Sequence, residues 1–199
     1  DYAANSENLN YIDKKRIGST GHSAGGNAAI RGADYFGKRA IETGEPSLLH
    51  SIFISGYVLT LRQDILEIVR SNVGVSYAFW DEGAYRNELQ NGDMRTAPEA
   101  LRAVNSGLAL EDLPPIDEVE IGRYYGDIDA RTLRVVHNER ILHPFQPYMI
   151  EATANQIEYF ERVFRHESDL ASTDQIWYWK ELLGMVSMIA ALVALIPLS

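Results

Sequence analysis

A serine set between glycines is the residue of this sequence best suited to nucleophilic chemistry. Residues 16–30 read RIGSTGHSAGGNAAI: a β-favouring entry, the pentapeptide GHSAG centred on Ser23, and then small and aliphatic residues that favour a helix. A serine attacks a carbonyl carbon only when its hydroxyl stands clear of the backbone and a base removes its proton. Gly21 and Gly25 permit a tight strand-to-helix turn, and the N–H of Ala24 at the helix start can bind an oxyanion.

The same pentapeptide has two simpler interpretations, both of which the flanking residues disfavour. A G-x-S-x-G pattern can arise by chance in a glycine-rich turn, but a strand before it and a helix after it favour a nucleophile. The segment GSTGHSAGG lacks the Gly-Lys-Ser/Thr ending of a phosphate-binding loop.

The residues around Ser23 also carry a family resemblance. The segment IDKKRIGSTGHSAGGNAA (12–29) resembles the nucleophile-elbow region of the α/β-hydrolase superfamily, especially its esterase and dienelactone-hydrolase-like branches with an Asp-x-x-Arg-Ile/Val-Gly entry. The resemblance implies that residues 5–165 form the C-terminal half of that fold. The family's earlier strands, and the loop with the second oxyanion amide, would then precede Asp1. It also implies the chain order serine, acid, histidine, with the acid and the base each following a later strand.

The carboxylate that this order requires is found after the expected strand VGVSYAFW (73–80). Asp81 follows that strand directly, and Glu82 is the alternative acid. A carboxylate there accepts the imidazole N–H, fixes the tautomer and stabilises the imidazolium. Asp127 and Asp129 come later, in the segment YYGDIDART (124–132), which is typical of a turn before the final strand.

Of the five histidines, His143 is the one whose position completes the order. It follows the expected strand TLRVVHNE (132–139) by four residues, and Pro144 favours a loop rather than a helix at that point. We expect His22 to pack near the turn without acting as the base. His50 and His137 belong to expected strands and His166 to a polar linker, so we expect these three histidines to be structural or solvent-exposed.

The remaining pattern alternates strands with helices. Expected strands cover 16–21, 48–56, 73–80 and 132–139; expected helices cover 27–44, 64–72, 97–107 and 147–164, with Pro98 in a first helical turn and Gly44 and Gly107 as stops. This alternation predicts an α/β fold whose mostly parallel sheet has helices on both faces.

The C-terminal residues predict a membrane helix. The run LLGMVSMIAALVALIPL (182–198) has no charged residue, and Trp177, Tyr178 and Trp179 precede it as an interfacial aromatic belt would. A buried core helix or a hydrophobic tail packed on the domain is the alternative. We therefore expect a partial hydrolase domain (1–165), a polar linker (166–175) and the start of a membrane region (176–199).

Composition narrows the range of functions. A net charge of -10 and a pI near 4.9 make nucleic acid an unsuitable partner, and the absence of cysteine excludes disulfides and thiolate chemistry. No His-Glu-x-x-His spacing suggests a metal, and the expected chemistry needs no cofactor. The aromatic residues of SYAFWDEGAYRN (76–87) either line an acyl pocket or pack in the core.

Taken together, the sequence predicts a membrane-tethered serine hydrolase acting on a small-molecule ester or thioester. Ser23 would attack the carbonyl, His143 would take and return the proton, Asp81 would orient His143, and the Ala24 N–H would bind the oxyanion. Two alternatives remain: a non-catalytic ligand- or partner-binding domain attached to a membrane module, and acyl transfer to an acceptor other than water. Families with this elbow and a C-terminal membrane region are typically bacterial, so we expect an extracytoplasmic domain on a bacterial cell membrane.

Overall fold

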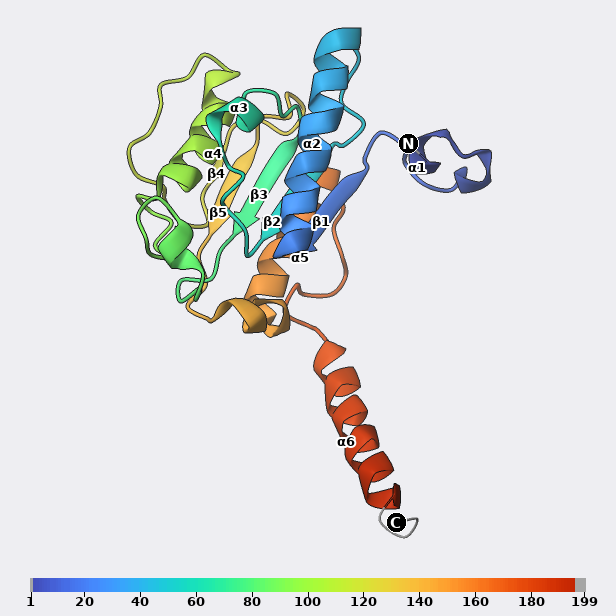
Figure 1. Cartoon of the computed structure of the whole chain (residues 1–199). Helices are drawn as coiled ribbons and strands as arrows, with labels where there is room; N and C mark the ends of the chain where they lie inside the picture. Colours follow the sequence, from blue (N-terminus) through green and yellow to red (C-terminus); the bar gives the residue numbers. More distant parts are fainter. Residues whose placement is uncertain (1, 196–199) are drawn as a thin grey trace.

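The computed structural model describes residues 2–195 and contains one five-stranded sheet (Figure 1). The strand order is β1-β2-β3-β5-β4, with β1 (Gly18–His22), β2 (Ser51–Ser55), β3 (Asn72–Ser76) and β5 (Arg134–His137) parallel. The short β4 (Tyr124–Tyr125) pairs antiparallel with β5. All four parallel strands therefore end at the same edge of the sheet, where loops carry functional side chains in α/β folds.

Helices flank the sheet on both faces (Figure 1). On one face pack α2 (Ala24–Thr43), α3 (Gln63–Leu66) and α4 (Pro98–Ala109), and on the other packs α5 (Ile150–Phe164). Along β2 the side chains alternate accordingly: Ile52 and Ile54 belong to the first core, and Phe53 belongs to the second with Tyr159 of α5. The predicted α/β class and mostly parallel sheet are confirmed.

Further short helices either precede β1 or connect later elements, and the position of the last of them contradicts one prediction. They are α1 (Tyr2–Asn5), η1 (Glu7–Leu9), η2 (Ala84–Arg86) and η3 (His143–Tyr148). We expected His143 in a loop and the long helix to begin at 147. Instead, residues 143–148 form a 3-10 turn and α5 begins at Ile150. Pro144 disfavours a helical conformation at His143, but a proline fits the first turn of a helix, so the 3-10 turn can still begin at His143.

Other predictions about the elements are also wrong. The helix expected over 64–72 is only α3, which ends at Leu66, and the strand expected over 73–80 ends at Ser76, five residues before Asp81. Helix α4 does not stop at Gly107 but continues to Ala109. A Cβ at this glycine would lie 2.3 Å from the carbonyl oxygen of Thr132, so the residue permits close packing of the helix on the strand that follows Thr132. The segment 124–132, expected to be a turn throughout, begins with β4. Gly44 does end α2, in the left-handed conformation.

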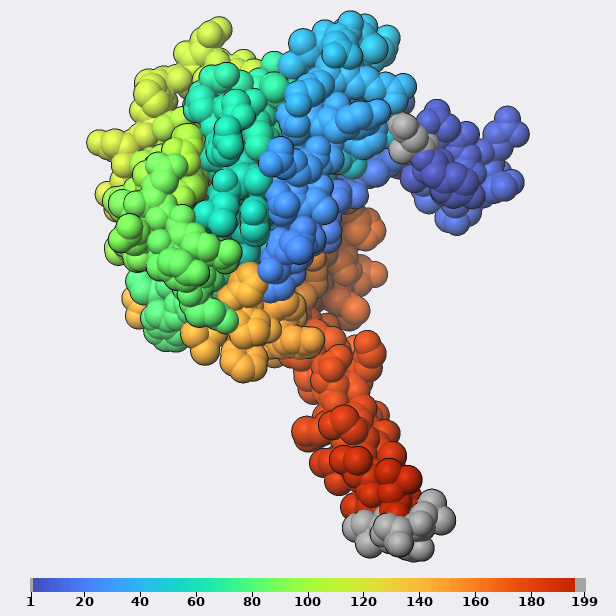
Figure 2. All heavy atoms as spheres, in the orientation of Figure 1, coloured from blue at the N-terminus to red at the C-terminus, as the bar shows by residue number. Residues whose placement is uncertain are grey.

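The C-terminal helix stands away from the sheet. Helix α6 (Trp177–Leu195) has a mean hydropathy of 1.5 over its most apolar window, and none of that window is buried (Figure 2). Helix α6 is therefore long enough and apolar enough to cross a membrane, and it is not a core helix of the domain. The last residues of the predicted membrane segment, including Pro197, lie outside the described residues.

Candidate active site

Ser23 occupies the turn between β1 and α2 in a backbone conformation that non-glycine residues rarely adopt. Its φ and ψ angles are 56° and -116°. Such a conformation costs roughly 1–3 kcal/mol and persists only where the surrounding structure imposes it. Here the Ser23 N–H donates to the carbonyl of Ser55 at 2.8 Å, and its own carbonyl accepts from the Asn27 N–H at 3.1 Å. The end of β2 and the first turn of α2 thus hold the serine in place.

The glycine two residues before Ser23 makes this turn sterically possible. A Cβ added to Gly21 would lie 2.3 Å from the carbonyl carbon of Gly25, so strand and helix approach more closely here than a side chain allows. The sequence pattern predicted this use for Gly21. For Gly25 the prediction is wrong, because a Cβ added there would meet no atom within 4 Å. The result is that the partly exposed Ser23 side chain faces a cavity beyond the sheet edge.

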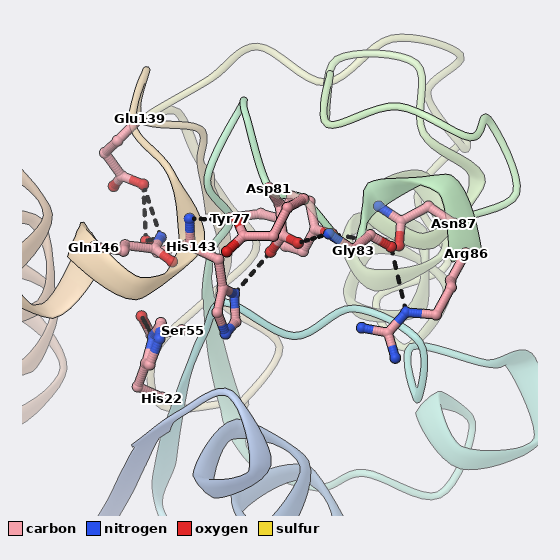
Figure 3. Close-up of polar contacts among 12 residues, drawn as sticks. His22, Ser55, Tyr77, Asp81, Gly83, Arg86, Asn87, Glu139, His143 and Gln146 are labelled. Carbon is pink, nitrogen blue, oxygen red and sulfur yellow. Dashed lines mark hydrogen bonds and ion pairs between the residues drawn. The ribbon is translucent and has the colours of Figure 1, made fainter.

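Asp81 and His143, 62 residues apart in sequence, form a hydrogen-bonded pair at the same edge (Figure 3). The imidazole Nδ1 of His143 lies 2.8 Å from Oδ2 of Asp81, whose side chain is only 6% exposed. The other carboxylate oxygen accepts the N–H of Gly83 at 2.7 Å. Because both oxygens of Asp81 are occupied, the carboxylate fixes the orientation of the histidine ring, with the proton placed on Nδ1.

Ser23, Asp81 and His143 line one cavity of 560 Å³, together with Ala24 and residues from the loops after β2 and β3. Within residues 2–195, neither the Ser23 hydroxyl nor Nε2 of His143 makes a hydrogen bond to another side chain. In unliganded enzymes the hydrogen bond between nucleophile and base is often long, and it tightens when substrate binds. The arrangement therefore supplies a hydroxyl, an oriented imidazole and a free ring nitrogen in one space.

The start of α2 adds a hydrogen-bond donor to this cavity. Ala24 is the first residue of α2, and in the described part of the chain its N–H has no acceptor. The first N–H groups of a helix lack partners within the helix, and they attract negative charge. The Ala24 N–H thus lies next to the serine with its donor available for an oxyanion.

His22 lies beside His143, but its ring nitrogen contacts Ser55 and not Asp81. The two ring centroids are 4.5 Å apart, and Nδ1 of His22 lies 3.2 Å from the Ser55 hydroxyl. Gly56 makes room for both rings, because a Cβ there would lie 2.6 Å from His22 and 2.9 Å from His143. Burial, and secondarily the charge of a protonated His143, lowers the pKa of His22. His22 is therefore a neutral neighbour that packs against the His143 ring.

Glu82, the alternative acid, contacts the same histidine at a different atom. One of its carboxylate oxygens accepts the backbone N–H of His143 at 3.3 Å, and the residue is exposed. The ring nitrogen of His143 is paired with Asp81 instead. The geometry thus gives Glu82 a contact with the backbone at the start of η3, whereas Asp81 orients the His143 ring.

The other residues weighed from the sequence lie elsewhere. The Nδ1 atom of His50 is 2.6 Å from the Ser51 hydroxyl, His137 is buried within β5, and His166 is exposed after α5. Asp129 pairs with Arg165, and Asp127 accepts the N–H of Ala130 within its own turn. None of these residues lines the Ser23 cavity.

Of the aromatic residues of 76–87, the two tyrosines line the cavity and Trp80 lies outside it. Tyr77 and Tyr85 line the cavity; Tyr77 is buried and its hydroxyl lies 3.5 Å from the amide oxygen of Asn87, while Tyr85 is 70% exposed. Burial raises the pKa of Tyr77, which keeps the hydroxyl neutral. Trp80 is 54% exposed and does not line the cavity.

Sequence reasoning missed a buried polar cluster beside the site. Glu139, 3% exposed, accepts hydrogen bonds from three uncharged donors: the Ser76 hydroxyl at 2.9 Å, the Gln146 amide at 3.1 Å and the Asn155 amide at 2.9 Å. Figure 3 shows Glu139 beside Gln146. These donors come from the end of β3, from η3 and from α5. The only signal in the sequence is a Glu two residues beyond a buried strand, and it does not reveal its partners.

Comparison with known proteins does not assign this chain to a family: no family model, no curated protein and no solved structure matches it. Among residues 2–195 there is also no group of three or more His, Asp and Glu side chains arranged to hold a metal ion.

Proposed function

We propose that this chain is a membrane-tethered serine hydrolase of the α/β-hydrolase type that cleaves carboxylic esters or thioesters. The observation that carries the proposal is the Asp81–His143 hydrogen bond, at the mouth of a cavity that also holds Ser23 on a strained turn. A bare G-x-S-x-G turn needs neither the pair nor the strain. Strain held by the surrounding structure is a feature of functional sites.

The chemistry follows from the roles of the three residues. His143 Nε2 takes the proton of the Ser23 hydroxyl as its oxygen attacks the substrate carbonyl, and Asp81 stabilises the imidazolium that forms. The Ala24 N–H donates to the oxyanion of the tetrahedral intermediate. His143 then protonates the leaving alcohol or thiol, and water repeats the sequence to release the acid and free Ser23.

The membrane tether is the second part of the proposal. Helix α6 is 19 residues long and completely unburied, and Trp177, Tyr178 and Trp179 lie at its start. Aromatic residues concentrate at the interface between lipid and water, so this end of the helix suits the membrane surface. We place the hydrolase domain on a bacterial cell membrane, on its extracytoplasmic side. The tether predicts that carbonate washing leaves the chain with the membranes, and release by carbonate would contradict it.

A single change at Ser23 tests the hydrolase activity. Ser23→Ala removes the nucleophile and leaves the backbone in place, so turnover of p-nitrophenyl acetate should fall by about 10⁶-fold or to the background rate. Labelling by a fluorophosphonate probe should be lost as well. Ser55→Ala, which removes a hydroxyl outside this cavity, is the matched control and should retain labelling.

The same assay separates the two alternatives. A non-catalytic binding domain would leave the unaltered chain unlabelled and inactive. Transfer to an acceptor other than water would preserve labelling, while adding candidate alcohols or amines would raise the rate and yield new acylated products.

A further inference from the structure

The segment that carries His143 presents an apolar surface to solvent. Residues 141–150 (ILHPFQPYMI) contain no Asp, Glu, Lys or Arg. Four of its large apolar side chains are 42–56% exposed, and we call them the His143 rim: Leu142, Phe145, Tyr148 and Ile150. Trp80 adjoins them, because its N–H donates to the carbonyl of Ile141 at 3.2 Å. Apolar side chains gathered on one surface mark an interaction site, whereas isolated ones do not.

The rim lies against the start of the apolar helix. The ring centroids of Tyr148 and Trp177 are 5.9 Å apart, and the Gln175 amide donates to the carbonyl of Ile150 at 3.0 Å. Figure 2 shows the segment around residues 140–150, in gold, at the end of the domain from which α6 leaves. The polar residues 166–175 therefore return the chain to the site end of the sheet, and α6 begins there.

Charged residues on both sides of the segment 141–150 limit how deeply the His143 rim can enter the apolar interior of a bilayer. Arg140 and Glu151 flank the segment 141–150 directly, and both are exposed. Charged residues beside exposed aromatic ones suit the headgroup layer of a bilayer, where amphipathic surfaces lie about 5–10 Å into the boundary with the acyl chains.

We propose that the His143 rim lies in the headgroup layer of the membrane that α6 crosses, so that the Ser23 cavity opens at the lipid surface and accepts esters whose acyl chains are held in the bilayer. The inference rests on the proposed function, both for the tether and for Ser23. Lipid is favoured over a protein partner because the rim is continuous with the first turn of α6. Tethering also holds the rim near the bilayer at high effective concentration.

Site-directed fluorescence tests the position of the rim without using catalysis. The chain has no cysteine, so Phe145→Cys, Ile41→Cys and Val186→Cys each give a single labelling site. These three side chains are similarly exposed, at 56%, 53% and 52%. Ile41 lies in the last turn of α2, at the end opposite Ser23, and Val186 lies in the middle of α6. Each variant carries an environment-sensitive fluorophore and is reconstituted in phosphatidylcholine vesicles with or without a lipid bearing a spin-label quencher.

We expect quenching at 145 and 186 and none at 41. Quenching at 186 alone leaves the tether in place and overturns the docking of the rim. A probe at 145 that is shielded from water but not quenched lies against protein, which overturns the lipid assignment. If neither 145 nor 186 is quenched, tether and docking both fail. Quenching at 145 without quenching at 186 supports docking and overturns the span.

A second measurement tests the substrate class. Replacing two aromatic rings in Phe145→Ser/Tyr148→Ser should lower hydrolysis of p-nitrophenyl palmitate in vesicles about tenfold relative to hydrolysis of p-nitrophenyl acetate in water. Ile41→Ser is the control and should not change this ratio. An unchanged ratio in the double variant overturns a bilayer-borne substrate. Inactivity of the unaltered chain on both esters would instead contradict the proposed hydrolase function, and the fluorescence result would still stand.

Discussion

Two acidic residues lie just beyond the carboxyl ends of neighbouring strands, and they differ in what they contact. Asp81 follows β3 and accepts the ring N–H of His143, at the wall of the Ser23 cavity. Glu139 follows β5 and is closed in by hydroxyl and amide donors, away from that cavity. Figure 3 shows the two groups on either side of the His143 ring.

The difference shows that a carboxylate's partners decide its role more than its place in the fold does. Asp81 faces a titratable ring whose second nitrogen is available to the cavity, so it can stabilise a charge that forms during reaction. Glu139 faces only uncharged donors and ties β3, η3 and α5 together. It lies four residues before His143 and bonds Gln146 of η3, the helix that begins at His143, so it supports the position of His143 without touching its ring.

Among substitutions at the two carboxylates, Asp81→Asn should produce the largest change, a loss of kcat. The amide keeps the shape and can still accept the Gly83 N–H, but it favours the wrong tautomer of His143, so kcat should fall by about 10⁴-fold with KM little changed. Steady-state kinetics on p-nitrophenyl acetate measure it. Asp64→Asn, at an exposed carboxylate paired with Arg62, is the control. Near-normal kcat in Asp81→Asn would remove this carboxylate from the mechanism.

Glu139→Gln should act mainly on stability. It places an NH₂ group where one carboxylate oxygen accepts a hydrogen bond, so a buried donor faces another donor, which costs about 1–3 kcal/mol of the free energy of unfolding. Urea denaturation in mild detergent measures this change, with the exposed Glu151→Gln as control. We expect kcat to fall far less than in Asp81→Asn. A loss of kcat as large as that of Asp81→Asn, at unchanged stability, would mean that the two carboxylates do not differ in role.

The sequence predicted the local features of the fold and the site, and few of the contacts between distant residues. The glycines around Ser23 predict the turn, because the pattern alone requires close approach of a strand and a helix. The alternation of apolar strands with helices likewise predicts the parallel sheet, and the structure confirms it. The positions of Asp81 and His143 after expected strands predict an acid–histidine pair, and in the structure Nδ1 of His143 lies 2.8 Å from Oδ2 of Asp81.

What the sequence could not provide depends on contacts between distant residues. Gly107 was interpreted as a helix stop, yet it is a packing contact with Thr132 that no local rule reveals. Strand β4 has two residues and exists only through pairing with β5. Glu139 has partners 63, 7 and 16 residues away, so its cluster is visible only once the sheet and α5 are assembled.

Titration of His137, a neighbour of Glu139, should have a smaller effect on the free energy of unfolding. Burial lowers the pKa of His137 below its usual 6.5, while Glu139 and Glu158 partly oppose this. The unfolded chain binds the proton of this histidine more readily than the folded chain does. The free energy of unfolding is therefore highest above pH 6.5, where His137 is neutral in both states. It then falls as the pH drops through 6.5 toward the folded value, by at most about 1.4 kcal/mol per pH unit for this group.

Urea titrations between about pH 7.5 and 5.5 measure this dependence. Burial also lowers the pKa values of His22 and His50, so His137→Leu should flatten the slope without abolishing it. An unchanged slope in His137→Leu would place the acid sensitivity at other groups.

Glu82→Gln should have the smallest effect and gives the sharpest contrast with its neighbour Asp81. The Glu82 carboxylate is exposed and accepts only the backbone N–H of His143, at 3.3 Å, and the amide oxygen of glutamine can accept the same bond. Its charge is also screened by water, so an interaction of about 0.2–1 kcal/mol is at stake, or less than about a fivefold change in kcat. The double variant Asp81→Asn/Glu82→Gln should be hardly slower than Asp81→Asn. If Glu82→Gln instead lowers kcat by several orders of magnitude while Asp81→Asn does not, the orienting acid is Glu82, and η3 must rotate the ring toward it when substrate binds.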